Sequence, residues 1–173
     1  QSIMDDKARR NLGAHYTSEE NILKLIKPLF LDDLWAEFER VKGNKNRLFE
    51  FHKKLRTLNF LDPACGSGNF LYVSLQLLMS LEKEVITHEL FNGLTLALPE
   101  VHPRQMYGIE INPIAHDLAS IVVWIGYIQW RQYNGYATLT RREPILQSLR
   151  DNIRQMDAIM SFSPRPEGEG QGV

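Results

Sequence analysis

The chain has 173 residues, of which 43% are apolar and 24% charged, values typical of a soluble globular protein with one domain-sized core. Its formal net charge of −1 excludes an overall positive field for nucleic acid, so any contact with DNA must be local or made elsewhere. The single cysteine, Cys65, excludes an internal disulfide and indicates a reducing, cytoplasmic compartment. We expect no signal peptide and no membrane-spanning segment, and the start at Gln1 rather than Met suggests a fragment.

The first part of the chain is expected to be helical after a polar lead-in over residues 1–17. Apolar residues recur at helical spacing over 18–41. Pro28 lies inside that pattern, which predicts a kink or two abutting helices. After a polar turn, a short helix at 48–55 completes an N-terminal helical region that spans 18–56.

An alternation of strands and helices follows over residues 57–162, and it predicts an α/β fold. The expected elements are strands at 57–61, 105–110 and 152–160, the last including its exit, with helices over 69–85 and from Pro113 onward. This order predicts three parallel strands with flanking helices and right-handed crossovers. The Pro/Gly/Glu-rich tail at 163–173 is expected to be disordered.

The second of these helices carries two apolar patterns. An apolar stripe is formed by Ile114, Leu118, Ile121, Val122, Ile125 and Ile128. Trp124, Tyr127 and Trp130 also recur, and their spacing favours packing against a neighbouring layer over a platform for stacked bases.

A glycine-rich turn, Asp62 to Gly68 (DPACGSG), separates the first expected strand from its helix. Its glycines allow the backbone to approach a ligand, and the helix N-terminus offers free N–H donors. A phosphate-binding loop would need Lys followed by Ser or Thr where Asn69 and Phe70 stand. A dinucleotide fingerprint would need a third glycine where Leu71 stands. Both ligand classes are therefore disfavoured.

Three acidic residues lie at or near the carboxyl ends of the expected strands, where parallel sheets bind ligands. These are Asp62, Glu110 and Asp157. S-adenosylmethionine has an ammonium group, a ribose diol and an adenine amino group, and the three acids supply acceptors for them in that order. The pattern favours this cofactor. For each acid the alternative is a capping or solvated carboxylate, an alternative that weighs most for Asp157.

Three motifs together resemble the adenine-specific N6 DNA methyltransferases. They are GAHYTSEENI from Gly13, DPACGSGNF from Asp62 and YGIEINPIA from Tyr107. The similarity extends from about Arg9 to Met160 and is greatest to bacterial type II restriction–modification proteins that fuse methylation and cleavage in one chain. It implies a partial Rossmann-like, class I S-adenosylmethionine-dependent methyltransferase fold.

Carried over by position, the resemblance implies cofactor-binding roles for nine residues. Tyr16 and Thr17 would border the methionine end of the cofactor, and Thr17 with Glu20 also forms a compatible capping-box pattern. The other roles are a cofactor loop of Asp62, Ala64, Gly66 and Gly68, a ribose ligand at Glu110, an adenine contact at Ile111 and an adenine amino acceptor at Asp157. No metal is implied, because the five histidines lack ligand spacing; apart from His15, we expect them on the surface.

The catalytic loop of that family, Asn- or Asp-Pro-Pro-aromatic, does not occur in this sequence. In the family this loop receives a flipped-out adenine. The resemblance therefore implies the S-adenosylmethionine-binding part, residues 57–162, of a site-specific DNA adenine-N6 methyltransferase. Such a part would be inactive alone and would meet DNA through regions of the parent protein missing here.

Two origins remain for a chain without this loop. The first is a truncation, which the abrupt change of composition at Ser163 favours. The second is a split protein whose catalytic half is another chain. An alternative function is a non-catalytic cofactor-binding subunit or pseudoenzyme that acts through a partner. In the complete fold the first strand is central, so its outer edge would be open here, and we expect a marginally stable chain that is weakly soluble or oligomeric.

Overall fold

The computed structural model describes residues 18–94, 98–136, 149 and 151–162, and the structural statements below concern these residues. The strands are β1 (Phe60–Asp62), β2 (Met106–Glu110) and β3 (Ile153–Gln155). The helices are α2 (Glu19–Ile26), the π-helical turn η1 (Lys27–Leu31), α3 (Asp32–Val41), α4 (Lys45–Thr57), α5 (Asn69–Phe91), the 3-10 turn η2 (Pro103–Gln105), α6 (Pro113–Tyr133) and α7 (Ala158–Phe162). Within the described part of the chain, no helix is long and apolar enough to cross a membrane.

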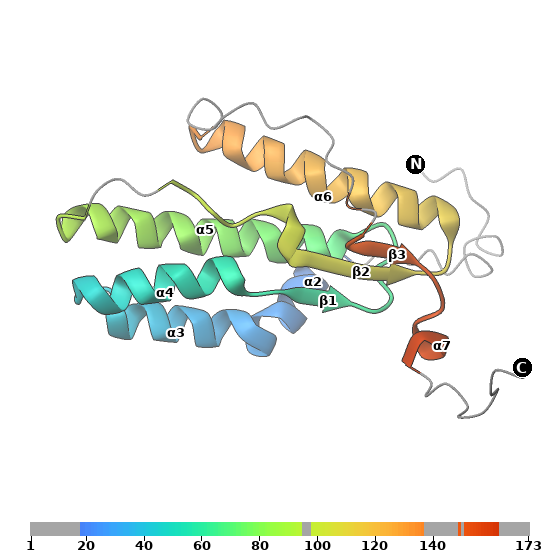
Figure 1. The fold of residues 1–173 in the computed structure, drawn as a ribbon, viewed down its shortest axis with the longest axis horizontal. Coiled ribbons are helices and arrows are strands. Elements are labelled where there is room, and N and C mark those ends of the chain that lie inside the picture. Colours follow the sequence, from blue (N-terminus) through green and yellow to red (C-terminus); the bar gives the residue numbers. More distant parts are fainter. Residues whose placement is uncertain (1–17, 95–97, 137–148, 150, 163–173) are drawn as a thin grey trace, which may run out of the picture.

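The three strands form one parallel sheet in the order β1-β2-β3, which confirms the predicted topology. Helices α5 and α6 run beside the strands, and α4 and α3 pack below α5 (Figure 1). The side chains of Leu61 and Tyr107, which are partners in the register, remain exposed. The core has two parts. One lies between the sheet and the helices α5 and α6, and the other lies between α5 and the N-terminal helices.

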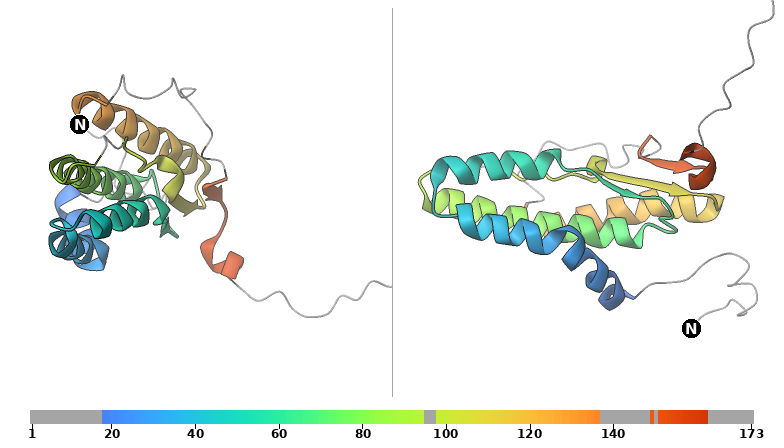
Figure 2. Two further views of the ribbon diagram at one scale, coloured as in Figure 1. Left: turned by 60° about the vertical axis from the view of Figure 1, so that its left-hand side comes forward. Right: turned by 90° about the horizontal axis from the view of Figure 1, so that it is seen from below.

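The kink expected at Pro28 takes the form of the π-helical turn η1, which joins the abutting helices α2 and α3. The Asp32 N–H donates to the Lys27 carbonyl, closing a wide turn that accommodates a residue without an N–H donor. The chain changes direction between α2 and α3 at this turn (Figure 2, right). Both α4 and α5 are longer than predicted, because tertiary packing stabilises turns that the local pattern leaves undecided.

Helix α6 packs on the core through a different face from its isoleucine stripe. Trp124, Tyr127 and Trp130 are buried, as predicted, whereas the stripe faces outward. Small residues decide this orientation. A Cβ at Gly126 would collide with the ring of Tyr72 on α5, so the absence of a side chain there allows the close approach of α6 to α5.

A buried ionic cluster joins α4 to α5, and it corrects the expectation of surface histidines. His52 is only 5% exposed, and its two ring nitrogens lie 3.0 Å from Glu89 Oε2 and 3.2 Å from Glu82 Oε1. The Glu82 carboxylate also accepts the N–H groups of Glu100 and Val101, which attaches the segment before β2 to α5. The protonated imidazole donates from both nitrogens and so reaches both carboxylates at once, although Glu89 Oε1 has no hydrogen-bond partner among the described residues.

Burial is the largest single influence on the pKa of His52 and lowers it, but the hydrogen bond to Glu82 and the charges of Glu89 and Glu82 together raise it above 6.5. The folded state therefore holds this proton more tightly than the unfolded state. The resulting stability is fully present below pH 6.5 and is lost as pH rises through the folded-state pKa.

We predict that the free energy of unfolding falls with pH above 6.5, by at most about 1.4 kcal/mol per pH unit. Urea unfolding followed by circular dichroism at pH 6, 7 and 8 measures this slope. His52→Gln should lower stability and flatten the slope, because the titrating group is gone. Lys53→Gln, an exposed change on the same helix, should leave the slope intact. Equal slopes in the native protein and His52→Gln would contradict the assignment.

Candidate cofactor site

The turn that follows β1 is held by backbone hydrogen bonds to itself and to β2. The Asp62 carboxylate accepts the Ala64 N–H at 3.0 Å, and the Cys65 N–H donates to the Ile109 carbonyl at 3.0 Å. The Gly68 N–H donates to the Cys65 carbonyl at 2.8 Å. These bonds make the loop compact, and the bond to Ile109 fixes its position relative to β2.

The side chain of Glu110 connects this loop to the end of β2. One of its carboxylate oxygens accepts the Gly66 N–H at 2.8 Å, and the other accepts the Asn112 N–H at 2.7 Å. Asn112 in turn caps α6 by accepting the N–H groups of Ile114 and Ala115. The position of the glycine loop and the start of α6 are therefore set by one carboxylate.

Two glycines of the loop have left-handed backbone conformations, for different reasons. Gly68 has φ +86°, and a Cβ there would lie 3.0 Å from the Ala119 Cα on α6. Gly66 has φ +53°, and a Cβ there would meet no atom within 4 Å. Gly68 is thus required for helix packing, whereas Gly66 leaves open space at the loop surface.

A cleft of about 450 Å³ opens at the carboxyl ends of the strands. The loop after β1 supplies its floor, and the segments after β2 and β3 supply its walls. Five of the predicted site residues line it: Ala64, Gly66, Glu110, Ile111 and Asp157. No Lys, Arg or His among the described residues lines this cleft. The arrangement suits a ligand with hydroxyl, amino or cationic groups rather than a phosphate.

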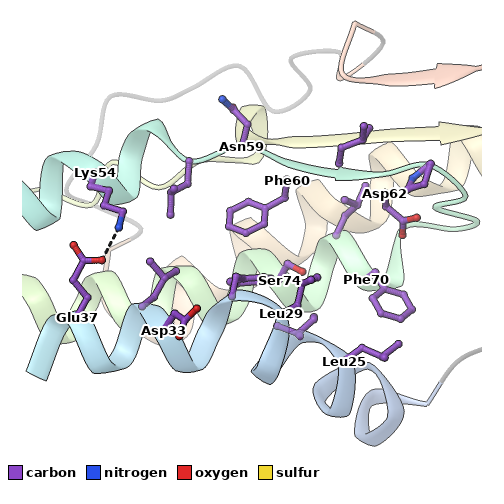
Figure 3. Close-up of a pocket in the computed structure, with 17 residues that line it drawn as sticks. Leu25, Leu29, Asp33, Glu37, Lys54, Asn59, Phe60, Asp62, Phe70 and Ser74 are labelled. Atoms are coloured by element: carbon purple, nitrogen blue, oxygen red, sulfur yellow. Dashed lines mark hydrogen bonds and ion pairs between the residues drawn. The ribbon is translucent and has the colours of Figure 1, made fainter. Parts of the chain in front are cut away.

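The other four predicted residues lie elsewhere. Gly68 is buried beneath the loop. Asp62 lies at the border, facing a larger and mostly apolar groove of about 660 Å³ between β1 and the helices α2, η1 and α3 (Figure 3). Tyr16 and Thr17 are outside the described residues. Because Pro63 and Phe70 line both spaces, the groove and the cleft adjoin at the glycine loop.

The wall formed by the segment after β3 contains the predicted Asp157 and residues that the sequence pattern did not single out. Asp157 accepts the N–H groups of Ile159 and Met160 at 2.8 and 3.4 Å, so it caps the short helix α7. This is the capping role that had stood as the alternative for this acid. Met156 and Ile159 also line the cleft. Their position just after the third strand was the available signal.

Burial raises the pKa of the Asp62 carboxyl; the Ala64 N–H opposes this shift, and the nearby charge of Glu110 adds to it. Burial, followed by the charges of Asp62 and Glu110, raises the pKa of the Cys65 thiol to about 12. Cys65 therefore stays protonated at neutral pH and is a poor nucleophile. Among the described residues, no group of three His, Cys, Asp or Glu is placed to hold a metal ion.

Comparison with known proteins identifies the family of this chain. The model of the MmeI DNA-methyltransferase domain matches residues 38–160. The chain belongs to this family. DNA methyltransferase A of Bacillus subtilis (strain 168) is 40% identical over 134 residues, 76% of this chain and 15% of that protein. The predicted resemblance to methyltransferases of type II restriction–modification systems is thereby confirmed.

Two further comparisons extend over most of the chain. A putative type II restriction enzyme and methyltransferase of Methanocaldococcus jannaschii is 26% identical over 93% of this chain and 16% of its own length. A solved structure of the Type IIL restriction–modification enzyme MmeI in complex with DNA has a TM-score of 0.79 and 47% identity. It covers 92% of this chain and 22% of the MmeI chain, and it supports a partial Rossmann-like fold. The chain therefore spans about a sixth to a fifth of the length of these relatives.

We predict that Gly68→Ala lowers the free energy of unfolding by about 2–5 kcal/mol, because it adds both backbone strain and a contact with α6. Gly135→Ala is the matched control: its φ of +78° is similar, but its Cβ would meet no atom within 4 Å. It should cost only about 1–2 kcal/mol. Chemical denaturation of both variants measures the difference. Equal losses would show that the close approach to Ala119 is not a constraint.

Proposed function

We propose that this chain binds S-adenosylmethionine as the cofactor-binding part of a site-specific DNA adenine-N6 methyltransferase. Membership of a DNA-methyltransferase family implies a methyl donor. The choice of donor rests on the lining of the strand-end cleft. Glu110 and Asp157 line the cleft, Asp62 borders it, and no described basic residue lines it. A sulfonium cofactor with an ammonium group and a ribose diol suits such a site.

Each acid has a role in this proposal. The oxygens of Glu110 each accept one backbone N–H, and their remaining lone pairs would accept the two ribose hydroxyls. Ile111, 66% exposed at the edge of the cleft, would cover the adenine, and Asp157 would accept from its amino group. Asp62 would receive the ammonium group, which would lower the pKa that burial now raises.

The loop residues have supporting roles. Ala64 and Gly66 line the cleft, and a bare backbone at Gly66 allows close approach of the ligand. Gly68 would act from below by keeping the loop against α6. Tyr16 and Thr17 would border the methionine end of the cofactor.

Methyl transfer itself would need residues that these 173 do not contain. The sequence has no Asn-Pro-Pro-aromatic segment to hold an extruded adenine. We therefore propose that the chain is inactive alone and that DNA is contacted by further parts of the parent protein. The alternative, a non-catalytic subunit or pseudoenzyme, would bind the same cofactor and act through a partner chain that carries this loop.

The decisive experiment is calorimetric titration of the folded chain with S-adenosylmethionine and with its demethylated product. We predict saturable binding that Glu110→Gln weakens by about 10- to 100-fold, because a glutamine cannot accept from two N–H groups and two hydroxyls together. Glu50→Gln, an exposed change on α4, should bind as the native chain does. Thermal melting of each variant separates lost binding from lost folding.

Two outcomes would contradict the proposal. One is the absence of binding heat at several temperatures in a folded sample. The other is unchanged affinity in Glu110→Gln. Incubation with labelled cofactor and DNA should give no methylated adenine from this chain alone, and methylation under those conditions would refute the proposed inactivity.

A further inference from the structure

The outer face of α6 is an apolar strip without a partner among the described residues. Its exposed members and their exposed fractions are Ile114 69%, Leu118 46%, Ile121 45%, Ile125 48% and Ile128 42%. They follow one another at intervals of four, three, four and three residues. This is the spacing with which one helix packs lengthwise against another at a shallow angle.

The strip is also uncharged. From Leu118 to Trp130 the sequence contains no Asp, Glu, Lys or Arg, although a helix face in water normally carries several. The opposite face of the helix is already buried through Trp124, Tyr127 and Trp130. A helix that is apolar on both faces is covered on both faces in a folded protein.

A membrane surface does not fit this helix. Helices that lie on a bilayer have Lys and Arg along their polar face. The only basic residue of this kind in α6 is Arg131, which is buried and donates to the Tyr127 hydroxyl and the Tyr136 carbonyl. The face opposite the strip is occupied by the protein's own core. A protein partner is therefore indicated.

The size of the strip favours a tethered partner over a second copy. A 21-residue helix is about 30 Å long and 10 Å wide, so its footprint is roughly 300 Å². Stable association of free chains commonly needs about 800 Å² from each partner. A helix in the same polypeptide has a high effective concentration and needs less contact. The relatives contain more than three-quarters of their length outside the segment matched here.

We propose that the outer face of α6 is covered by a helix with a complementary apolar stripe, supplied by the same polypeptide from outside residues 1–173. This inference does not depend on which cofactor the cleft binds. It explains why the isoleucine stripe, the more obvious core face in the sequence, is left outside in the described structure.

Photo-cross-linking in the full-length protein tests the proposal. p-Benzoylphenylalanine is placed at Ile125 and, as a control, at Lys24, whose side chain is 65% exposed on α2. The expected product from position 125 migrates as a monomer and joins α6 to a peptide outside residues 1–173. A cross-link to another copy, a cross-link within residues 1–173, or no cross-link would each overturn the proposal.

Thiol labelling gives an independent measurement that needs no bulky probe. Ile121→Cys should react with a maleimide at least about 100-fold more slowly than Lys24→Cys in the native protein, because reaction requires local opening. Cys65, with a pKa of about 12, contributes little background. Equal labelling rates at the two positions would overturn the proposal. Protection of Ile121→Cys that disappears on dilution would indicate a second copy of the chain and would also overturn it. Protection that requires phosphatidylglycerol vesicles would indicate a membrane and would also overturn it.

Discussion

The carboxylate of Glu110 is the contact on which the site depends. It accepts one N–H from the loop after β1 and one from the segment after β2, at 2.8 and 2.7 Å. Without it, two loops leaving adjacent parallel strands would have no shared polar anchor at the mouth of the cleft. Because Asn112, one of its donors, caps α6, the same contact also sets where that helix begins.

Close approach of backbones is the second constraint, and it explains which surfaces are buried. Gly68 lies against Ala119, Gly126 lies against the ring of Tyr72, and a Cβ at Gly108 would lie within 2.7 Å of the Cys65 sulfur. These contacts bring α6, α5 and the sheet together through small residues. The larger isoleucines of α6 are then directed away from the core, so composition alone misleads about the buried face.

The three strands and their parallel order could be predicted from the sequence because they depend on local signals and on one topological rule, although the third strand, expected over 152–160, ends at Gln155 and is followed by α7. Parallel strands place their carboxyl ends at one edge. Glu110 and Asp157 accordingly line one cleft, and Asp62 lies at its border. The orientation of α6 and the burial of His52 depend on partners 30 or more residues away. The local spacing of apolar residues does not indicate which distant segment a helix will pack against. A histidine that lies between two glutamates of another helix has no sequence pattern by which it could be predicted.

Among the described residues, β1 has a strand partner on one side only, and this open edge of the sheet lies beside the proposed cofactor cleft and not within it. Successive residues of a strand direct their N–H and carbonyl groups to opposite sides. The N–H of Gly108 faces β3 and the carbonyl of Ile109 faces β1, so the backbone groups of Tyr107 also face β1. In a parallel pair the register partner of such a residue, here Leu61, directs its own N–H and carbonyl away from β2. That edge borders the apolar groove that Asp62 faces (Figure 3). The loop after β1 forms the floor of the cleft and the segments after β2 and β3 form its walls, without any contribution from this edge. In the part of the chain that the structure describes, the strand-end cleft and the unpaired edge of β1 are therefore adjacent but separate features of the fold.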